Sequence, residues 1–540
     1  MILSLIKCIL FYFYINLSLC DKIVLHSGAG GKSHIKAVLE IGKELNLRGH
    51  EIYYVAPKEN ANFVIGYNFT YLASGSIDNE KWSLDAVTKR INGFNEPIDR
   101  FGVASSIIGT LMPALYEDSF VSFKEILEEL NPDLLFCDFF SPVCRDIGKL
   151  LNIPIINTFQ HADMYGLQSN GVISNSFGLN DMYLNQCSFI VRLYEMIYLK
   201  LKEIYYFLPF INKMQQLRAK FNIPQSINPL GDWDKDLALA NTFFPYEPIL
   251  PIQPNFHMIG PIFNNNYIQL SNELDIFLNQ HNNIVYVAFG SNVLLGNKIM
   301  TKFMTVLIEG LNKGLYNGII FGLGLSKLNF ELNVNNFNYT TQQLIENQHP
   351  NIRLLNWAPQ QAILNHEHTK LFLSHCGLES TFESISAKKP LLCHPFLADQ
   401  PRSSQKVIQM NVGLSIDIHQ NTIKQIHYKI NQLLNNNKFE MNLNRVNNII
   451  KNRRNMKSQT ADLVEAHLEL TKLCSKDSTC YNAHLSKSES NFWKDYYLDI
   501  IGFLLTSIII ISIFFIYTFY KLFLRFQSKK LVYTVKKKKE

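Results

Sequence analysis

The segment KIVLHSGAGGKSHIKAVLEIGKELNLRGHEIYYVA, residues 22–56, decides the fold class of the first half of the chain. The apolar run Lys22–His26 predicts a strand, and a glycine-rich turn, Ser27–Ser33, follows it. Apolar residues then recur at helical spacing as far as Arg48, where the helix is expected to end before Gly49. A second apolar run, Glu51–Ala56, completes a β–α–β unit, and such units build parallel sheets.

Further short apolar runs predict two parallel sheets in succession. The remaining predicted strands are Leu134–Cys137, Ile155–Asn157 and Leu237–Ala240, then Ile284–Phe289, Gly318–Phe321, Ile352–Leu355, Leu371–Ser374 and Pro390–Cys393. Five prolines from Pro245 to Pro261 predict a linker between the two series. We therefore expect an α/β chain of two Rossmann-like halves that face a cleft. Ligands in such sheets bind beyond the carboxyl ends of the strands.

The composition supports large folded cores. The chain has 540 residues, of which 47% are hydrophobic and 18% charged, which fits two folded units and argues against extensive disorder. The net charge of +6 comes from the last twenty residues, where eight Lys and Arg stand against one Glu. The rest is about neutral, so the folded part lacks the basic surface of a nucleic-acid binder.

Both ends of the chain carry apolar segments. Residues 1–20 resemble a secretory signal peptide. Residues 500–520 hold no charge and are long enough to form a transmembrane helix, since a bilayer core of ~30 Å needs about 20 residues. The basic tail, residues 521–540, then places the C-terminus in the cytosol and the bulk of the chain in the lumen. Lys537 and Lys538 resemble a di-lysine retrieval signal of endoplasmic reticulum membrane proteins.

The nine cysteines include no CxxC pair, so a zinc site is not expected. Cys474 and Cys480 are close enough in sequence to close a small disulfide loop in the lumen. Two free thiols are the alternative.

The most informative stretch is WAPQQAILNHEHTKLFLSHCGLESTFESISAKKPLLCHPFLADQ, residues 357–400. A turn at His375–Gly377 follows a predicted strand and opens a predicted helix, Ser380–Ser386, and helix starts bind phosphate groups through backbone N–H groups. Trp357 offers a face on which a base can stack. Glu383 suits ribose hydroxyls, and Asp399 with Gln400 suits sugar hydroxyls.

This stretch resembles the nucleotide-sugar signature of the UDP-glycosyltransferase family, which includes animal UDP-glucuronosyltransferases and plant small-molecule glucosyltransferases. The matching elements are W-x-P-Q, H-x-G, S-x-x-E and P-x-x-x-D-Q, at the family's spacing. The resemblance implies a role in donor binding for ten residues. They are Trp357 and Ala358 at uracil, Gln360 and Glu383 at ribose, His375, Gly377, Ser380 and Ser291 at the diphosphate, and Asp399 and Gln400 at the sugar.

Glu379 departs from this pattern, because the family usually has Asn there. A carboxylate 4 Å from a phosphate charge costs about 4 kcal/mol at an effective dielectric of 20. The sequence therefore predicts that Glu379 points away from the diphosphate or that donor affinity is reduced.

His34 and Asp138 are the candidate catalytic pair. Transfer to a hydroxyl needs a base, and a helix start disfavours imidazolium, so His34 at the start of the first helix suits that role. Asp138, at the end of a predicted strand, is placed to orient it. The resemblance supports both residues, since the family's His lies in G-x-S-H and its Asp in D-x-x-x-P.

The resemblance implies a GT-B fold with five parts: a signal peptide (1–20), an acceptor domain (21–250), a UDP-sugar domain with returning helices (255–480), a transmembrane helix (500–520) and a cytosolic tail (521–540). The expected reaction is inverting transfer of glucose or glucuronate from UDP-sugar to a hydroxyl of an apolar small molecule. Neither a metal nor a cofactor is expected. A non-catalytic relative that binds a lipophile or partner and an enzyme of lipid-linked glycan assembly remain as alternatives.

Overall fold

The computed structural model describes most of the folded chain. It describes residues 20–28, 31–76, 100–162, 172–173, 182–183, 188–226, 228, 230, 233, 236–247, 254–264, 267–290, 293, 295–324, 326, 339–396, 399–474 and 498–537. Two compact units are present, residues 1–476 and residues 477–540. The first unit holds both sheets. The predicted signal peptide, apart from Cys20, lies outside the described residues.

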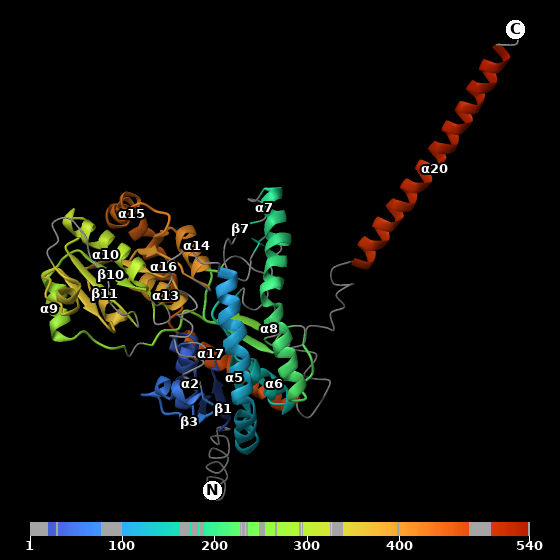
Figure 1. Ribbon diagram of the computed structural model, residues 1–540. Helices are drawn as coiled ribbons and strands as arrows, with labels where there is room; N and C mark the ends of the chain where they lie inside the picture. The colour runs from blue at the N-terminus through green and yellow to red at the C-terminus, as the bar shows by residue number, and fades with distance from the viewer. Residues whose placement is uncertain are drawn as a thin grey trace, which may run out of the picture. The chain divides into compact units, whose positions relative to one another are not determined.

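Two parallel sheets form the framework of the first unit (Figure 1). The first has the order β3-β2-β1-β4-β5-β8-β9, with β1 Lys22–His26, β2 Glu51–Ala56, β3 Thr70–Ala73, β4 Leu134–Asp138, β5 Ile155–Phe159, β8 Leu237–Ala240 and β9 Phe256–Met258. The second has the order β12-β11-β10-β13-β14-β15, with β10 Ile284–Ala288, β11 Gly318–Gly322, β12 Ile352–Leu355, β13 Thr369–Ser374, β14 Leu391–Cys393 and β15 Gly413–Ser415. The expected fold class, two Rossmann-like domains, is confirmed.

Helices cover both faces of each sheet. Those of the first half are α2 Lys32–Leu47, η1 Lys58–Val64, α5 Arg100–Leu130, α6 Pro142–Leu150, α7 Phe189–Leu193, η5 Tyr194–Leu199 and α8 Lys200–Lys220. Those of the second half are α9 Asn272–Gln280, α10 Asn297–Asn312, α11 Thr341–Ile345, α12 Gln360–Asn365, α13 Leu378–Ser386, α14 Gln400–Gln409, α15 Ile423–Asn435, α16 Asn437–Asn452 and α17 Met456–Cys474. A short antiparallel pair, β6 Val172–Ile173 and β7 Met182–Tyr183, stands apart.

Side-chain alternation along the central strands builds a core on each face of each sheet. In β10, Val285 and Val287 point into the core that includes α10, while Tyr286 points into the opposite core. In β1, Ile23 and Val24 divide between two cores in the same way. This period of two is the reason why short, wholly apolar runs predicted buried parallel strands correctly.

The last helix of the first unit packs against its first helix. Ala461, Val464 and Leu468 of α17 lie in the same core as β1 and α2. Arg48, which follows α2, donates hydrogen bonds to Asp462 at 2.6 Å and to other groups of α17. The chain therefore returns to its N-terminal half after completing the second sheet.

The structure differs from the predicted elements in several places, of which the following bear on the sheets and on the predicted donor site. The proline-rich linker segment contributes β9, which pairs with β8, so the first sheet extends past residue 250. Strands β3 and β15 were not predicted, because neither is a buried apolar run: β3 has the sequence TYLA with no buried residue, and β15 has the sequence GLS. Helix α13 begins at Leu378, two residues before the predicted start, with Gly377 as its N-cap.

The second unit contains a single long helix among the residues that the structure describes, α20 Leu498–Lys537. Within it Gly502–Arg525 has a mean hydropathy of 2.3, and by length and composition it is able to cross a membrane. This segment overlaps the transmembrane helix expected at residues 500–520.

Leu468→Ala should lower the stability of the whole chain. Leu468 of α17 is almost fully buried in the core that this helix shares with the first sheet. Truncating such a buried leucine to alanine typically lowers the free energy of unfolding by about 2–5 kcal/mol. Leu473→Ala is the matched control, because Leu473 is on the same helix but largely exposed, and its cost should stay within about 0.5 kcal/mol. Thermal unfolding of the detergent-solubilised full chain gives the comparison. Equal melting temperatures for the two variants would show that α17 does not stabilise the first half.

Candidate functional site

The two sheets place their reversal points at the carboxyl ends of their central strands. The order reverses between β1 and β4 in the first sheet and between β10 and β13 in the second. In open parallel sheets such a point leaves a crevice for a ligand, because the connections leave in opposite directions. Every predicted site residue that the structure describes lies at or after the carboxyl end of a strand or on the helix after it.

His34 and Asp138 face each other at the first reversal point. His34 lies in the first turn of α2, and Asp138 is the last residue of β4. His34 Nδ1 lies 3.9 Å from Asp138 Oδ1, and among the described residues neither atom has a hydrogen-bond partner. This distance exceeds a hydrogen bond, but catalytic hydrogen bonds are often long before substrate binds. Burial raises the pKa of Asp138, against the charges of His34 and Arg145 and the hydrogen bond from Phe140 N–H.

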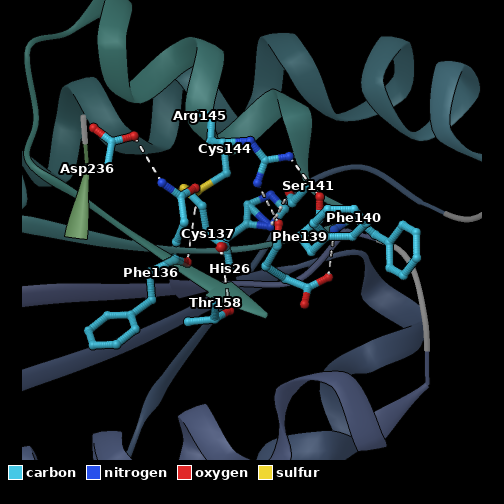
Figure 2. Close-up of a disulfide and its surroundings, with 12 residues drawn as sticks. His26, Phe136, Cys137, Phe139, Phe140, Ser141, Cys144, Arg145, Thr158 and Asp236 are labelled. Carbon is cyan, nitrogen blue, oxygen red and sulfur yellow. Dashed lines mark hydrogen bonds between the residues drawn. A yellow bond between two sulfur atoms is a disulfide. The ribbon is translucent and has the colours of Figure 1, made fainter. Parts of the chain in front are cut away.

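Arg145 fixes the backbone that carries Asp138 (Figure 2). Its guanidinium is fully buried and donates to the carbonyls of Asp138 at 2.9 Å, Phe139 at 2.8 Å and Leu230 at 2.6 Å. Burial lowers the pKa of Arg145 to about 10. The sequence analysis did not single out Arg145, which lies next to Asp146 in the short helix α6.

A disulfide joins β4 to α6, between Cys137, the residue before Asp138 in the sequence, and Cys144 (Figure 2). A second disulfide, Cys376–Cys393, joins the turn after β13 to the end of β14. Neither was predicted, because the sequence analysis considered only the pair Cys474 and Cys480. Cys480 lies outside the described residues.

The predicted ribose residues converge at the start of α12 and on α13. The Gln360 amide donates to Ser380 Oγ at 3.0 Å and to Glu383 Oε2 at 2.7 Å. Gln361 donates to the other oxygen, Glu383 Oε1, at 2.6 Å. Glu383 is buried, so a ribose would compete here with protein donors that already hold the carboxylate.

His375 is held between two glycines. A Cβ added at Gly377 would lie 2.5 Å from His375 Nε2, and one added at Gly290 would lie 2.8 Å from it. Gly290 has a φ of +77°, which only glycine adopts readily. Burial lowers the pKa of His375 to about 4, although Asp399 opposes this. At neutral pH the imidazole is therefore uncharged and acts as a hydrogen-bond donor or acceptor.

The other predicted donor residues are placed as follows. Trp357 follows β12 with 68% of its surface exposed and lines an open pocket with Arg353 and Pro359. Ala358 lies next to the carboxyl end of β11. Gln400 is buried, and its side-chain oxygen accepts from the N–H of Phe396 at 2.9 Å. Ser291 lies outside the described residues.

Asp399 is tied to the first half of the chain by a residue that the sequence analysis missed. His161 Nε2, which follows β5, lies 3.2 Å from Asp399 Oδ2. On the other side, His161 Nδ1 lies 3.4 Å from Glu247 Oε1, and Lys406 pairs with Glu247 at 2.6 Å. Burial opposes ionisation of Asp399, but the hydrogen bond and charge of His161 outweigh it and lower the pKa of Asp399.

The residue before His161 contacts helix α2. The Gln160 amide donates to the carbonyl oxygen of His34 at 2.9 Å. The end of β5 therefore contacts both His34 and the predicted sugar-binding residue Asp399. The sequence signal was weak, because the predicted strand ended at Asn157, whereas the observed strand ends at Phe159, directly before Gln160 and His161.

Glu379 pairs with a lysine of the first half. Its Oε1 lies 2.5 Å from Lys36 Nζ, on the same helix as His34. Lys36 also donates to Glu383 Oε1 at 3.2 Å. Burial raises the pKa of Glu379, while Lys36 opposes that shift. The sequence analysis predicted that Glu379 points away from the diphosphate or that donor affinity is reduced. It could not identify Lys36 as the partner of Glu379, because the two residues are far apart in the sequence.

The two parallel sheets with their helices have the GT-B fold of glycosyltransferases. Among similar solved structures is a Phytolacca americana UGT2 complexed with UDP-2fluoro-glucose and pterostilbene, with a TM-score of 0.57 and 16% identity over 83% of this chain and 100% of that one. The glycosyltransferase of kitacinnamycin also has a TM-score of 0.57 at 16% identity, covering 83% of this chain and 99% of that one. These similarities establish the fold.

The sequence comparisons establish the family. The model for UDP-glucoronosyl and UDP-glucosyl transferase matches residues 24–538, and the chain belongs to this family. Relatives include UDP-glycosyltransferase 1 of Phaeomoniella chlamydospora, 28% identical over 64% of this chain and 70% of that protein. UDP-glucuronosyltransferase 1A3 of Homo sapiens is 22% identical over 89% and 87%. The reaction class is therefore glycosyl transfer from a UDP-sugar, and the expected family is confirmed.

Gly290→Ala should weaken UDP binding about tenfold or more, because its Cβ would displace the His375 ring. Gly314→Ala is the matched control. Gly314 also has a positive φ, +69°, but nothing lies within 4 Å of its added Cβ, so this variant carries only a backbone strain of roughly 1–3 kcal/mol. Titration of UDP with both purified variants compares them. Unchanged affinity in Gly290→Ala would exclude the His375 region from the nucleotide site.

Proposed function

We propose that this chain transfers glucose or glucuronate from UDP-sugar to a hydroxyl group of an apolar small molecule, with inversion at the anomeric carbon. The observation that carries the mechanism is the pairing of His34 Nδ1 with Asp138 Oδ1, two buried atoms without other partners, at a reversal point of the sheet. A buried carboxylate facing one imidazole nitrogen selects the tautomer whose other nitrogen is free to accept a proton.

His34 is the general base in this proposal. With its Nδ1–H toward Asp138, His34 Nε2 accepts the proton of the acceptor hydroxyl. The acceptor oxygen forms a bond to the anomeric carbon as the bond from that carbon to the diphosphate oxygen breaks, and UDP leaves with the electron pair. Asp138 stabilises the imidazolium that forms. One displacement inverts the configuration, and no covalent enzyme intermediate is needed.

The leaving diphosphate is stabilised by the start of α13 in the proposed complex. The unpaired N–H groups there and the neutral His375 imidazole supply donors to the developing negative charge. We propose that these groups serve in place of a metal ion, so transfer should persist in excess chelator.

The substrates follow from the site and from similar proteins. The Phytolacca americana neighbour is complexed with UDP-2fluoro-glucose, and the human relative is named a UDP-glucuronosyltransferase, so both sugars are candidate donors. An apolar acceptor fits the surroundings of the base, because the ring of Phe140 lies 5.2 Å from that of His34, centroid to centroid. Asp399 and Gln400 are proposed to bind the sugar hydroxyls.

A panel assay tests this function. Full-length protein in membranes is incubated with UDP-glucose or UDP-glucuronate and with phenols, sterols or a polyprenyl phosphate, and glycosylated products are measured. A glycosylated phenol or sterol supports the proposal. UDP binding without any product would indicate a non-catalytic relative, and product with the polyprenyl phosphate alone would indicate lipid-linked glycan assembly.

His34→Ala and Asp138→Asn should each lower kcat by about 10²-fold or more while UDP affinity changes little. Because burial raises the pKa of Asp138, folding favours its neutral form, and the stability from that form is lost as the pH rises through this pKa. Asp138→Asn is neutral at every pH, so above that pKa it should be at least as stable as the wild type. Kinetics and melting temperatures are measured together. Transfer within tenfold of wild type, about 1.4 kcal/mol of barrier, would remove either residue from the mechanism.

We propose a location in the endoplasmic reticulum membrane, with the catalytic part in the lumen. The apolar helix Gly502–Arg525 and the basic residues after it support the anchor and its orientation. Two disulfides support an oxidising compartment. Asn68-Phe-Thr70 is a glycosylation sequon with an exposed Asn68, whereas the sequon at Asn338 begins outside the described residues.

In sealed microsomes, an added protease should remove only the tail after about Tyr520, at most the last twenty residues. Endoglycosidase treatment after solubilisation should increase the gel mobility of the wild type, and Asn68→Gln should reduce that shift, because the lumen is where such sequons are modified. Immunoblotting with an antibody to the folded part reads both results. Complete digestion without detergent would overturn the luminal orientation.

A further inference from the structure

Lys36 joins the two halves of the chain at the donor site. It lies two residues after His34 on α2, and its ammonium group contacts Glu379 at 2.5 Å and Glu383 at 3.2 Å, both on α13. The Lys36 side chain is only 19% exposed. One positive charge and two negative charges therefore meet between the helix that carries the proposed base and the helix proposed to bind the diphosphate.

The two carboxylates are unusual partners for a diphosphate site. Glu379 lies in the first turn of α13, where the helix start favours an anion, and Glu383 lies one turn later on the same face. Burial opposes the charge on Lys36, but Glu379 and Glu383 outweigh it and raise the pKa of Lys36, so it stays an ammonium ion. Without Lys36, the partly exposed Glu379 carboxylate and the buried Glu383 carboxylate would repel each other and any phosphate bound near them.

We propose that Lys36 is the counter-ion that permits donor binding next to Glu379, and that it acts as a positioning residue supplied by the acceptor half. This inference rests on the proposed function, since it assumes that UDP binds at the start of α13. Lys36 does not transfer a proton. It lowers the negative charge that the diphosphate meets and holds α2, with His34, against the donor half.

This assignment explains why a family position usually occupied by Asn can hold Glu in this chain. An amide there needs no counter-ion, whereas a carboxylate does. The residue that supplies it comes from the other half of the chain, 343 positions away in sequence from Glu379. Glu379 and Lys36 should therefore behave as a unit, and replacing one should change the effect of replacing the other.

A double-mutant cycle tests the unit, with UDP affinity measured by calorimetry and donor KM and kcat measured separately. Lys36→Met should raise the UDP Kd and the donor KM about tenfold or more, with a smaller change in kcat, because charge at the binding site is altered. Glu379→Gln added to Lys36→Met should restore most of the lost affinity. Lys36→Arg should bind like the wild type, and Lys43→Met, on the same helix but outside this cluster, is the matched control.

Salt separates an electrostatic role from a packing role. Raising the ionic strength should reduce the difference in UDP affinity between Lys36→Met and wild type, since it screens repulsion between the carboxylates and the diphosphate. If Lys36→Met bound UDP as tightly as the wild type, or if adding Glu379→Gln restored no UDP affinity, the inference about Lys36 would be overturned while the proposed function would stand. Absence of UDP binding by the wild type would overturn the proposed function and this inference with it.

Discussion

The whole site depends on one constraint of parallel sheets: the strands of a sheet end at the same edge. In each half, the first strand lies in the middle of the sheet, and later strands are added on both sides of it. The turn after β1, the end of β4 and the end of β5 therefore meet at one edge. The turn after β10 and the turn after β13 meet at one edge of the second sheet. His34, Asp138 and His161 come from the first edge, and His375 comes from the second.

The structure also buries charged side chains, among them Arg145 and Glu247, and each of these two has specific polar or charged partners. Arg145 is surrounded by backbone carbonyls that hold the turn after Asp138. Burial opposes the charge of Glu247, but Lys406 and His161 outweigh it and lower the pKa of Glu247. Such groups are expensive to remove from water, and they persist where several partners satisfy them at once. Both clusters lie directly behind a predicted site residue, Asp138 in one case and Asp399 in the other.

Contacts between the halves are made by the same elements that carry the candidate chemistry. Helix α2 carries His34, which faces Asp138, and Lys36, which contacts Glu379 of α13. The end of β5 provides Gln160 to the His34 backbone and His161 to Asp399. A change in how the halves meet would therefore alter the proposed base and the proposed sugar site together. This arrangement links donor binding to the position of the base, as expected when a bond forms between two substrates held by different halves.

The sequence by itself determined the elements and the local chemistry. Apolar runs predicted β1, β2, β8 and β12 with their observed bounds. Such runs are sufficient because the pattern that marks a strand or a helix involves only residues that are close together in the sequence. Local motifs also placed His34 at the start of the first helix and Asp138 at the end of a strand, whereas the pairing of β1 with β4 came only from the structure. Only the tertiary structure decided which distant groups meet. The pairing of Glu379 with Lys36, of Asp399 with His161, and of Cys376 with Cys393 depends on how separate elements pack. A periodic pattern in the sequence cannot predict a contact such as that of Lys36 with Glu383, because the two residues are 347 positions apart.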